Sequence, residues 1–215
     1  MVSGQLSQLV KVVQKNHVLH KYSGKNEMIK DAIPFFREGL SNNESVMIVT
    51  NQFTQEKFVN ILKLHFGEKI DDLVLKNKII YKNTKEWYFP NGTVDVLRII
   101  SNWKKVVNSC IENGSSGLWV FADMGEFFEN NLVSEVIVYE SALTPQFDFP
   151  FTAVCAYPQE SLSSLTKDQR VELLGHHGIH SAGSNTSIMC ECGVSFPSDY
   201  SECPSCKKLV DSVLS

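Results

Sequence analysis

Four cysteines near the C-terminus have the spacing of a metal site. Cys190 and Cys192 form one close pair, and Cys203 and Cys206 form a second after ten intervening residues. Zinc binds four thiolates in a tetrahedron at about 2.3 Å, and two tight turns can supply them without long-range order. A segment this short cannot bury a core of its own, so the metal must stabilise it. We therefore predict a zinc ribbon over residues 188–215 that holds one structural zinc ion.

Free thiols or a redox pair are the alternative interpretation of these cysteines. The first pair has one intervening residue where ribbons commonly have two, and Lys207 stands where a glycine often follows the second pair. Four exposed thiols so close together would be a liability, which favours the metal. Four cysteine ligands leave no open coordination position, so the predicted role is structural. The other two cysteines, Cys110 and Cys155, lie in apolar segments and are expected to be small buried hydrophobic side chains.

Three carboxylates form a second set of candidates. Asp123 and Glu126 follow the apolar run 117–122, which has the composition of a buried strand. Ligands of open parallel sheets bind beyond the carboxyl ends of the strands, so this pair could anchor a ligand. Capping of the following loop or helix explains the pair equally well. Glu140 lies among apolar residues of a predicted helix, where a buried charge needs a partner, and a structural partner is favoured over a place in the ligand pocket.

Histidines and tyrosines from both ends of the main domain could reach the same edge. His20 and Tyr22 precede the predicted strands, Tyr157 ends one of them, and His176 and His177 follow the last. A metal site would need three ligands with defined spacing, whereas the sequence offers an adjacent pair and one remote histidine. Hydrogen-bonded structural histidines are therefore favoured, and a ligand-binding role stays open. No catalytic residue is assigned.

The elements that must position these residues alternate between strands and helices. Short apolar runs predict strands at 45–50, 78–81, 117–122 and 151–156. Amphipathic segments predict helices at 5–16, 27–40, 54–66, 93–113, 132–143 and 166–174, with Thr54 and Thr166 as N-caps. This alternation predicts an α/β domain with a mostly parallel sheet covered by helices on both faces. We place this domain at residues 1–180, a linker at 181–187 and the ribbon at 188–215.

The turn after the strand at 45–50 lacks the residues of a phosphate loop. An ATP-binding domain of RecA type would carry Gly-x-x-x-x-Gly-Lys-Ser/Thr here, and the backbone amides of that loop bind phosphates. The chain instead has Asn51-Gln-Phe-Thr-Gln-Glu-Lys57-Phe58, without either glycine and without the magnesium-binding hydroxyl. The sequence therefore predicts a RecA-like architecture that does not hydrolyse ATP.

Several short segments stand in a fixed order along about residues 17–180. They are His20-Lys-Tyr22, residues 33–40 with 44–49, residues 117–126, Tyr139-Glu140, Cys155-Ala-Tyr157 and Leu174-Gly-His-His177. Together they resemble the methanogen/methylotroph sensory (MEDS) domain, a RecA-like module without a working phosphate loop. The resemblance implies sensing of small organic compounds with no established turnover. The chain departs from the family at Gly178, where proline is common, and around Glu126, which lies in Met-Gly-Glu-Phe-Phe.

The expected function is a non-catalytic sensory or regulatory module. A small molecule would bind at the carboxyl edge of the sheet, and the ribbon would contact a partner protein. An enzyme that uses Asp123 and Glu126 with a histidine for acid–base or hydrolytic chemistry is one alternative. A zinc-ribbon accessory protein of a transcription or nucleic-acid complex is another. The residues expected to bind the small molecule are His20, Tyr22, Asp123, Glu126, Glu140, Tyr157, His176 and His177.

Charge and composition narrow the classes of partner. The net charge of −4 and the few basic residues near the cysteines argue against nucleic acid. The first residues lack the basic region and apolar stretch of a signal peptide, and no segment has the roughly 20 apolar residues that span a bilayer. We therefore expect a cytoplasmic protein that does not bind membranes. A homodimer stays open.

Overall fold

A central sheet organises the computed structural model, which describes residues 15–182, 185–190, 192, 195–197 and 200–209. Within these residues the sheet has eight strands in the order β3-β2-β4-β5-β1-β6-β7-β8. Neighbouring strands from β3 to β6 in that order are parallel, and β7 and β8 are antiparallel to their neighbours. The predicted α/β class with a mostly parallel sheet is therefore confirmed. The strands are β1 (His17–Tyr22), β2 (Ser45–Val49), β3 (Ile79–Lys82), β4 (Leu118–Asp123), β5 (Phe151–Pro158), β6 (Ile179–Ala182), β7 (Asn185–Met189) and β8 (Ser195–Pro197).

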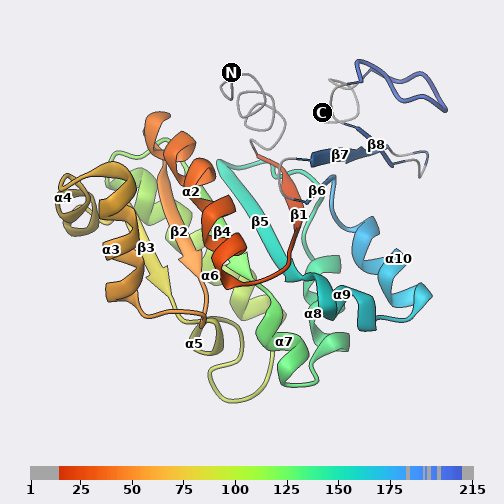
Figure 1. The fold of residues 1–215 in the computed structure, drawn as a ribbon, viewed down its shortest axis with the longest axis horizontal. Coiled ribbons are helices and arrows are strands. Elements are labelled where there is room, and N and C mark those ends of the chain that lie inside the picture. The colour runs from red at the N-terminus through yellow and green to blue at the C-terminus, as the bar shows by residue number, and fades with distance from the viewer. Residues whose placement is uncertain (1–14, 183–184, 191, 193–194, 198–199, 210–215) are drawn as a thin grey trace.

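Helices cover both faces of this sheet (Figure 1). One face packs against α2, α3 and α4 through side chains such as Phe36 and Phe58. The other face packs against α5 to α10 through side chains such as Trp103 and Tyr139. The helices of the described residues are α2 (Lys25–Ser41), α3 (Gln55–Phe66), α4 (Ile70–Leu75), α5 (Thr84–Tyr88), α6 (Val96–Glu112), α7 (Gly125–Glu129), α8 (Val133–Ser141), α9 (Gln159–Ser164) and α10 (Lys167–Gly175).

Continuous apolar runs become the central strands because both of their faces are covered. Every residue of β2 and of β4 is buried. Successive side chains of a strand point to opposite faces, so Leu19 enters one core and Val18 the other. Thr54 and Thr166 cap α3 and α10 as predicted, and Thr166 exchanges two hydrogen bonds with Gln169 in a capping box.

β1 is the main element that the sequence pattern failed to predict. It lies between β5 and β6, and all of its residues except Lys21 are buried. Polar residues interrupt the apolar run that marks the other central strands, so the pattern of β1 is weak. His20 and Tyr22 therefore belong to the sheet itself and do not precede it. Of the helix predicted at 5–16, residues 5–14 lie outside the described residues.

The sheet continues past α10 toward the cysteines. β6 pairs with β7 and β7 pairs with β8, so the predicted linker at 181–187 includes the end of β6 and the first residues of β7. The division into main domain, linker and ribbon stays a prediction. α2 continues through Pro34. In the part of the chain that the structure describes, no helix combines the length and the hydrophobicity needed to cross a bilayer.

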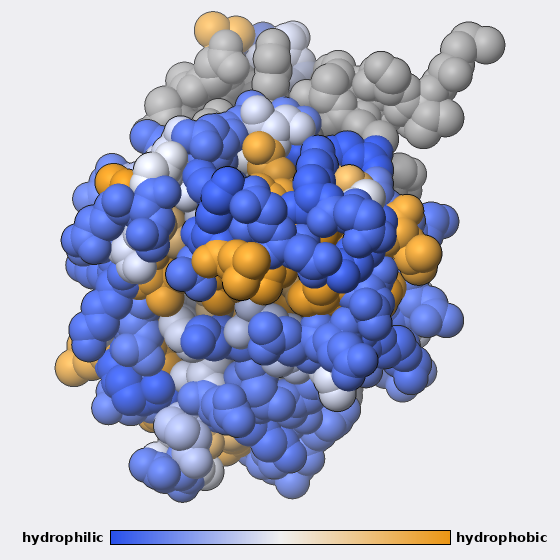
Figure 2. Space-filling model, turned by 90° about the vertical axis from the view of Figure 1, so that its left-hand side faces the viewer, coloured by the Kyte–Doolittle hydropathy of each residue, from blue (hydrophilic) through white to orange (hydrophobic). Residues whose placement is uncertain are grey.

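The face of the molecule on which α3 and α4 lie is largely hydrophilic, with a band of apolar side chains across it (Figure 2). Leu64 of α3 and Leu75 of α4 are 85% and 83% exposed. Single exposed apolar side chains are common on protein surfaces, so these two carry no functional conclusion.

Candidate functional site

Asp123 joins the ends of three strands at the carboxyl edge of the sheet. It is fully buried at the end of β4, and its carboxylate accepts hydrogen bonds from the hydroxyls of Tyr22 (2.8 Å) and Thr50 (3.2 Å). The backbone N–H of Gly125 donates a third hydrogen bond at 3.0 Å. Burial raises the pKa of Asp123, and the hydrogen bonds only partly offset that effect. The carboxylate thus fastens β1, β2 and β4 together and finds its partners within the protein.

Glu126 belongs to a separate network in α7. Its side chain accepts hydrogen bonds from the amides of Asn51 (2.6 Å) and Asn130 (3.1 Å), and Nζ of Lys85 lies 3.5 Å from Oε2. The hydrogen bonds described for Glu126 and for Asp123 do not connect the two carboxylates. The geometry therefore gives no support to an acid–base pair made of these residues.

The predicted group of histidines divides between the two faces of the sheet. Nδ1 of His20 lies 2.8 Å from Oγ of Ser181, and its Nε2 lies 3.0 Å from Oδ2 of Asp31, on the face that α2 covers. The ring of His177 lies on the opposite face, where it contacts α8 and α10. The side chain of His176 is partly buried, and one of its ring nitrogens has no hydrogen-bond partner. His20 and His177 therefore share no site.

Glu140 is the centre of a polar cluster inside the domain. It lies in α8 with no exposed surface, and its Oε2 is 3.0 Å from Nε2 of His17 and 3.6 Å from Nε2 of His177. The hydroxyl of Tyr157 donates a hydrogen bond to Oε1. Burial acts to raise the pKa of Glu140, but the two imidazoles and the tyrosine hydroxyl outweigh it and lower the pKa to about 2. Glu140 is thus held as a carboxylate.

Cys155 of β5 completes this cluster. Its Sγ lies 3.3 Å from Nε2 of His17 and 3.8 Å from Oε2 of Glu140. Burial raises the pKa of the thiol well above its ordinary value. Burial also lowers the pKa of His177 to about 3, with a further contribution from His17. We refer to His17, Glu140, Cys155 and His177 as the buried cluster.

Sequence reasoning named only part of the buried cluster. Glu140 and His177 were candidates for separate reasons, and His17 was not assigned a role. Cys155 was expected to be a small buried hydrophobic side chain. Cys155 is buried as expected, but it contacts polar groups. The available signal was a set of polar residues inside otherwise apolar elements: Tyr139-Glu140, Cys155-Ala-Tyr157 and the pair of histidines after α10.

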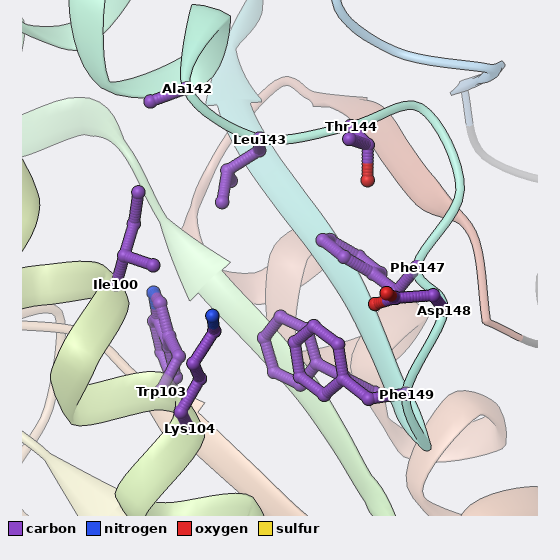
Figure 3. Close-up of a pocket in the computed structure, with 10 residues that line it drawn as sticks. Ile100, Trp103, Lys104, Ala142, Leu143, Thr144, Phe147, Asp148 and Phe149 are labelled. Carbon is purple, nitrogen blue, oxygen red and sulfur yellow. The ribbon is translucent and has the colours of Figure 1, made fainter.

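Figure 3 shows an aromatic hollow near the amino end of β5. Asp123 lies at the opposite edge of the sheet, because it ends β4 and β4 is parallel to β5. The volume of the hollow is about 170 Å³. The rings of Phe149 and Phe151 stack with their centroids 5.4 Å apart. Figure 3 shows Lys104 on one wall and Asp148 on the other, so the hollow carries one charged group of each sign. Its apolar walls come from α6, the loop between α8 and β5, and the first residue of β5, and they include Ile100, Trp103, Leu143, Phe147, Phe149 and Phe151.

Phe147 connects the aromatic hollow with the buried cluster. Its ring centroid lies 4.8 Å from that of Phe151 and 5.8 Å from that of His17. On the same side, the backbone N–H of Leu143 donates to the carbonyl of Glu140 at 3.0 Å. The wall of the hollow therefore contacts two residues of the buried cluster, His17 and Glu140.

The four C-terminal cysteines come together after β7. Sγ of Cys190 lies 3.4 Å from Sγ of Cys206, and Sγ of Cys192 lies 3.6 Å from Sγ of Cys203. All four sulfur atoms lie within 4.8 Å of one another, and none is in a disulfide. Ligands at about 2.3 Å from a tetrahedral zinc ion are about 3.8 Å apart, so the arrangement can hold a metal ion.

Comparison with known families and structures adds to this geometry. Residues 16–177 match the family model described as "MEthanogen/methylotroph, DcmR Sensory domain" (MEDS). No curated protein shows significant sequence similarity to the chain. The flagellar accessory protein FlaH from Methanocaldococcus jannaschii is 11% identical with a TM-score of 0.50, over 87% of this chain and 82% of that one. An uncharacterized protein from Pyrococcus horikoshii, crystallised with an unknown peptide, is 12% identical with a TM-score of 0.51, over 84% and 81%. At these identities the likeness shows the fold alone.

Proposed function

This chain belongs to the MEDS family of sensory domains, and on that premise we propose that it is a non-catalytic sensor of a small organic molecule bound in the aromatic hollow. The observation that carries the proposal is the hollow itself, which is lined by aromatic side chains and touches the buried interior through Phe147. Apolar concave surfaces with a few convergent polar groups are the usual binding sites of small molecules.

The carboxyl edge of the sheet, where the sequence led us to expect the ligand, supports binding less well. The carboxylate of Asp123 already accepts hydrogen bonds from Tyr22, Thr50 and Gly125. The carboxylate of Glu126 already accepts hydrogen bonds from the amides of Asn51 and Asn130. A ligand that used these groups would first have to break the hydrogen bonds of the two carboxylates, at a cost of about 1 kcal/mol or more for each bond. The aromatic hollow requires no such exchange.

Size and chemistry limit the molecules that the hollow can hold. Its volume of about 170 Å³ is below the roughly 300–1,000 Å³ of pockets for drug-sized molecules. A compound of only a few non-hydrogen atoms is therefore expected. The rings of Trp103 and Phe149 favour an apolar body, and Lys104 and Asp148 offer a hydrogen bond to one polar end. Short alcohols, amines and carboxylates fit this description.

We propose that the output passes along the sheet to a partner protein. The backbone N–H of His17 donates to the carbonyl of Pro145 at 2.9 Å, so the loop that forms one wall of the hollow is bonded to β1. β1 pairs with β6, and the sheet continues through β7 and β8 to the four cysteines. A structural zinc ion there would fix the turns that carry the cysteines. Lys207 is paired with Glu202, which supports a protein partner over nucleic acid.

Thermal-shift and NMR titrations of the full chain with the compound classes above test this proposal. A true ligand at about 100 times its Kd should stabilise the fold by about 2.7 kcal/mol. Ala142→Trp places a large ring at the lining of the hollow and should abolish the response. Ser141→Trp adds the same ring at the neighbouring position, which does not line the hollow, and should leave the response intact.

Two results would oppose the proposal. If none of these compounds stabilises a well-folded sample, the proposal of a small organic ligand would be contradicted. A ligand whose binding is lost in Asn51→Ala, at the carboxyl edge, but kept in Ala142→Trp would move the site back to the carboxyl edge of the sheet.

A further inference from the structure

We propose that His17, Glu140, Cys155 and His177 bind one divalent transition-metal ion of the Zn²⁺ type in the interior of the domain. This site is distinct from the four C-terminal cysteines and from the aromatic hollow. It uses Nε2 of both histidines, Sγ of the cysteine and Oε2 of the glutamate. It does not depend on the proposed organic ligand.

Four of the six distances between the ligand atoms are known, and they are close to the edges of a tetrahedral site. The four atoms all lie within 4.8 Å of one another. Nε2 of His17 is 3.0 Å from Oε2 of Glu140 and 3.3 Å from Sγ of Cys155. Oε2 of Glu140 is 3.6 Å from Nε2 of His177 and 3.8 Å from Sγ of Cys155. Zinc ligands at about 2.0–2.3 Å form a tetrahedron with edges of about 3.3–3.8 Å.

Second contacts of the ligand residues orient them toward a common point. Nδ1 of His17 lies 3.2 Å from the carbonyl oxygen of His176, and Nδ1 of His177 lies 2.9 Å from that of Leu173. A carbonyl can only accept, so both Nδ1 atoms carry the hydrogen. Whenever such a ring is neutral, its lone pair is on Nε2, which faces Glu140. Metal-binding histidines are held by this kind of outer hydrogen bond.

Without a cation the same geometry leaves acceptors facing one another. Nε2 of His177 is buried and has no hydrogen-bond partner. Its lone pair and that of Nε2 of His17 both point toward the carboxylate of Glu140, whose other oxygen is taken by Tyr157. Protonation of His17 would satisfy one of these contacts but would leave His177 unpaired. A single cation between the four atoms satisfies all of them.

The donor set selects the class of ion. Two imidazoles, one thiolate and one carboxylate suit a borderline ion such as Zn²⁺, and the arrangement is tetrahedral. A thiolate and a carboxylate bring two negative charges, which a divalent ion neutralises. The cost of burying separate charges is thereby reduced. The side chains of His17, Glu140 and His177 have no exposed surface, so the site has no open position for a substrate and would be structural or regulatory.

The proposed ion would tie together four elements from distant parts of the chain. His17 begins β1, Glu140 lies in α8, Cys155 in β5, and His177 follows α10. Because the site is enclosed, the ion would enter as the domain folds, and its binding free energy would add to the stability of the fold.

Metal analysis of the full chain provides the test. The C190S/C192S/C203S/C206S variant lacks the C-terminal cysteines, so after loading with Zn²⁺ and removal of the excess it should retain one equivalent. Loaded with Co²⁺, this variant should show thiolate-to-metal absorption from the single sulfur of Cys155. Adding Cys155→Ser should remove that absorption. Adding Cys110→Ser, which changes a buried cysteine outside the cluster, should leave it unchanged.

X-ray absorption on the unmodified chain gives an answer even where a variant fails to fold. With both sites filled, the C-terminal zinc ion has four sulfur ligands. The zinc ion of the buried cluster has one sulfur ligand, and nitrogen and oxygen atoms complete its shell. With the C-terminal site alone, each zinc has four sulfur ligands. Two results would overturn the proposal. One is a zinc shell made of sulfur only. The other is a folded C190S/C192S/C203S/C206S variant that retains neither Zn²⁺ nor Co²⁺.

Discussion

The rings of His17 and His177 lie 4.0 Å apart, centroid to centroid, although one residue begins β1 and the other follows α10. The pairing of β1 with β5 and β6 brings them together, because this register places the start of β1 beside the loop that precedes β6. The backbone N–H of Gly178 donates to the carbonyl of His17 at 3.2 Å and closes this contact. The two ends of the family domain thus meet at the buried cluster.

The network of Asp123 should be a large source of stability at the carboxyl edge. Asp123→Ala leaves the hydroxyl of Tyr22 and the N–H of Gly125 buried without an acceptor, so we expect a loss of about 2–4 kcal/mol. Tyr22→Phe removes one hydrogen bond and should cost about 1 kcal/mol. Urea denaturation of both variants and of the double variant would measure the coupling. Purely additive losses would show that the two groups do not act as a pair.

Gly117 should tolerate no side chain, because the backbone just before β5 lies too close. A Cβ there would lie 2.6 Å from the carbonyl oxygen of Pro150, a backbone atom that cannot move aside easily. We expect Gly117→Ala to destabilise the protein by about 1–3 kcal/mol, as overpacked sites do. Gly175→Ala is the matched control, since a Cβ there meets nothing within 4 Å. Equal melting temperatures for the two variants would contradict the packing seen at Gly117.

Glu44 should contribute stability that is lost as the pH rises from about 4.5 to about 7. Burial raises the pKa of Glu44 from 4.5 to about 7, with Lys15 acting in the opposite direction. In that interval the folded state binds the proton and the unfolded state releases it, so unfolding becomes easier as the pH rises. Glu44→Gln should remove this part of the slope and stabilise the protein above pH 7 by about 1–3 kcal/mol. Denaturant titrations across this pH range would measure the change in slope. Glu56→Gln, at an exposed position of α3, is the control variant. An unchanged slope in Glu44→Gln would count against the raised pKa.

Removal of the metal ion that we propose for the four C-terminal cysteines should leave the main domain folded. Cys203→Ser or treatment with a chelator should release the ion from the four cysteines, because the remaining thiolates bind zinc much more weakly. The sheet from β3 to β6 has its own two cores and should keep its secondary structure. Circular dichroism and zinc release would be followed together, with Ser205→Ala as the control. Collapse of the whole fold on loss of this ion alone would show that the cysteines do not form a separable unit.

The sequence could predict features that depend on neighbours along the chain. Thr54 and Thr166 cap helices because a hydroxyl reaches the backbone three residues later, whatever the rest of the fold does. Cys190, Cys192, Cys203 and Cys206 can meet because the chain between them is short. The α/β class followed from the alternation of apolar runs and amphipathic segments. The strand β1 escaped prediction because its polar residues break the apolar run.

The buried cluster could not be predicted in this way, because it depends on register and on face. His17 and His20 are three residues apart, and on a strand this spacing sends their side chains to opposite faces. Only the pairing of β1 with β5 places His17 near Cys155, and only the packing of α8 and α10 adds Glu140 and His177. The sequence by itself determined the class of fold and the four-cysteine cluster, since both are set by local spacing. The tertiary structure alone decided which polar residues share the interior, since side chains far apart in the chain meet only where the sheet brings them together.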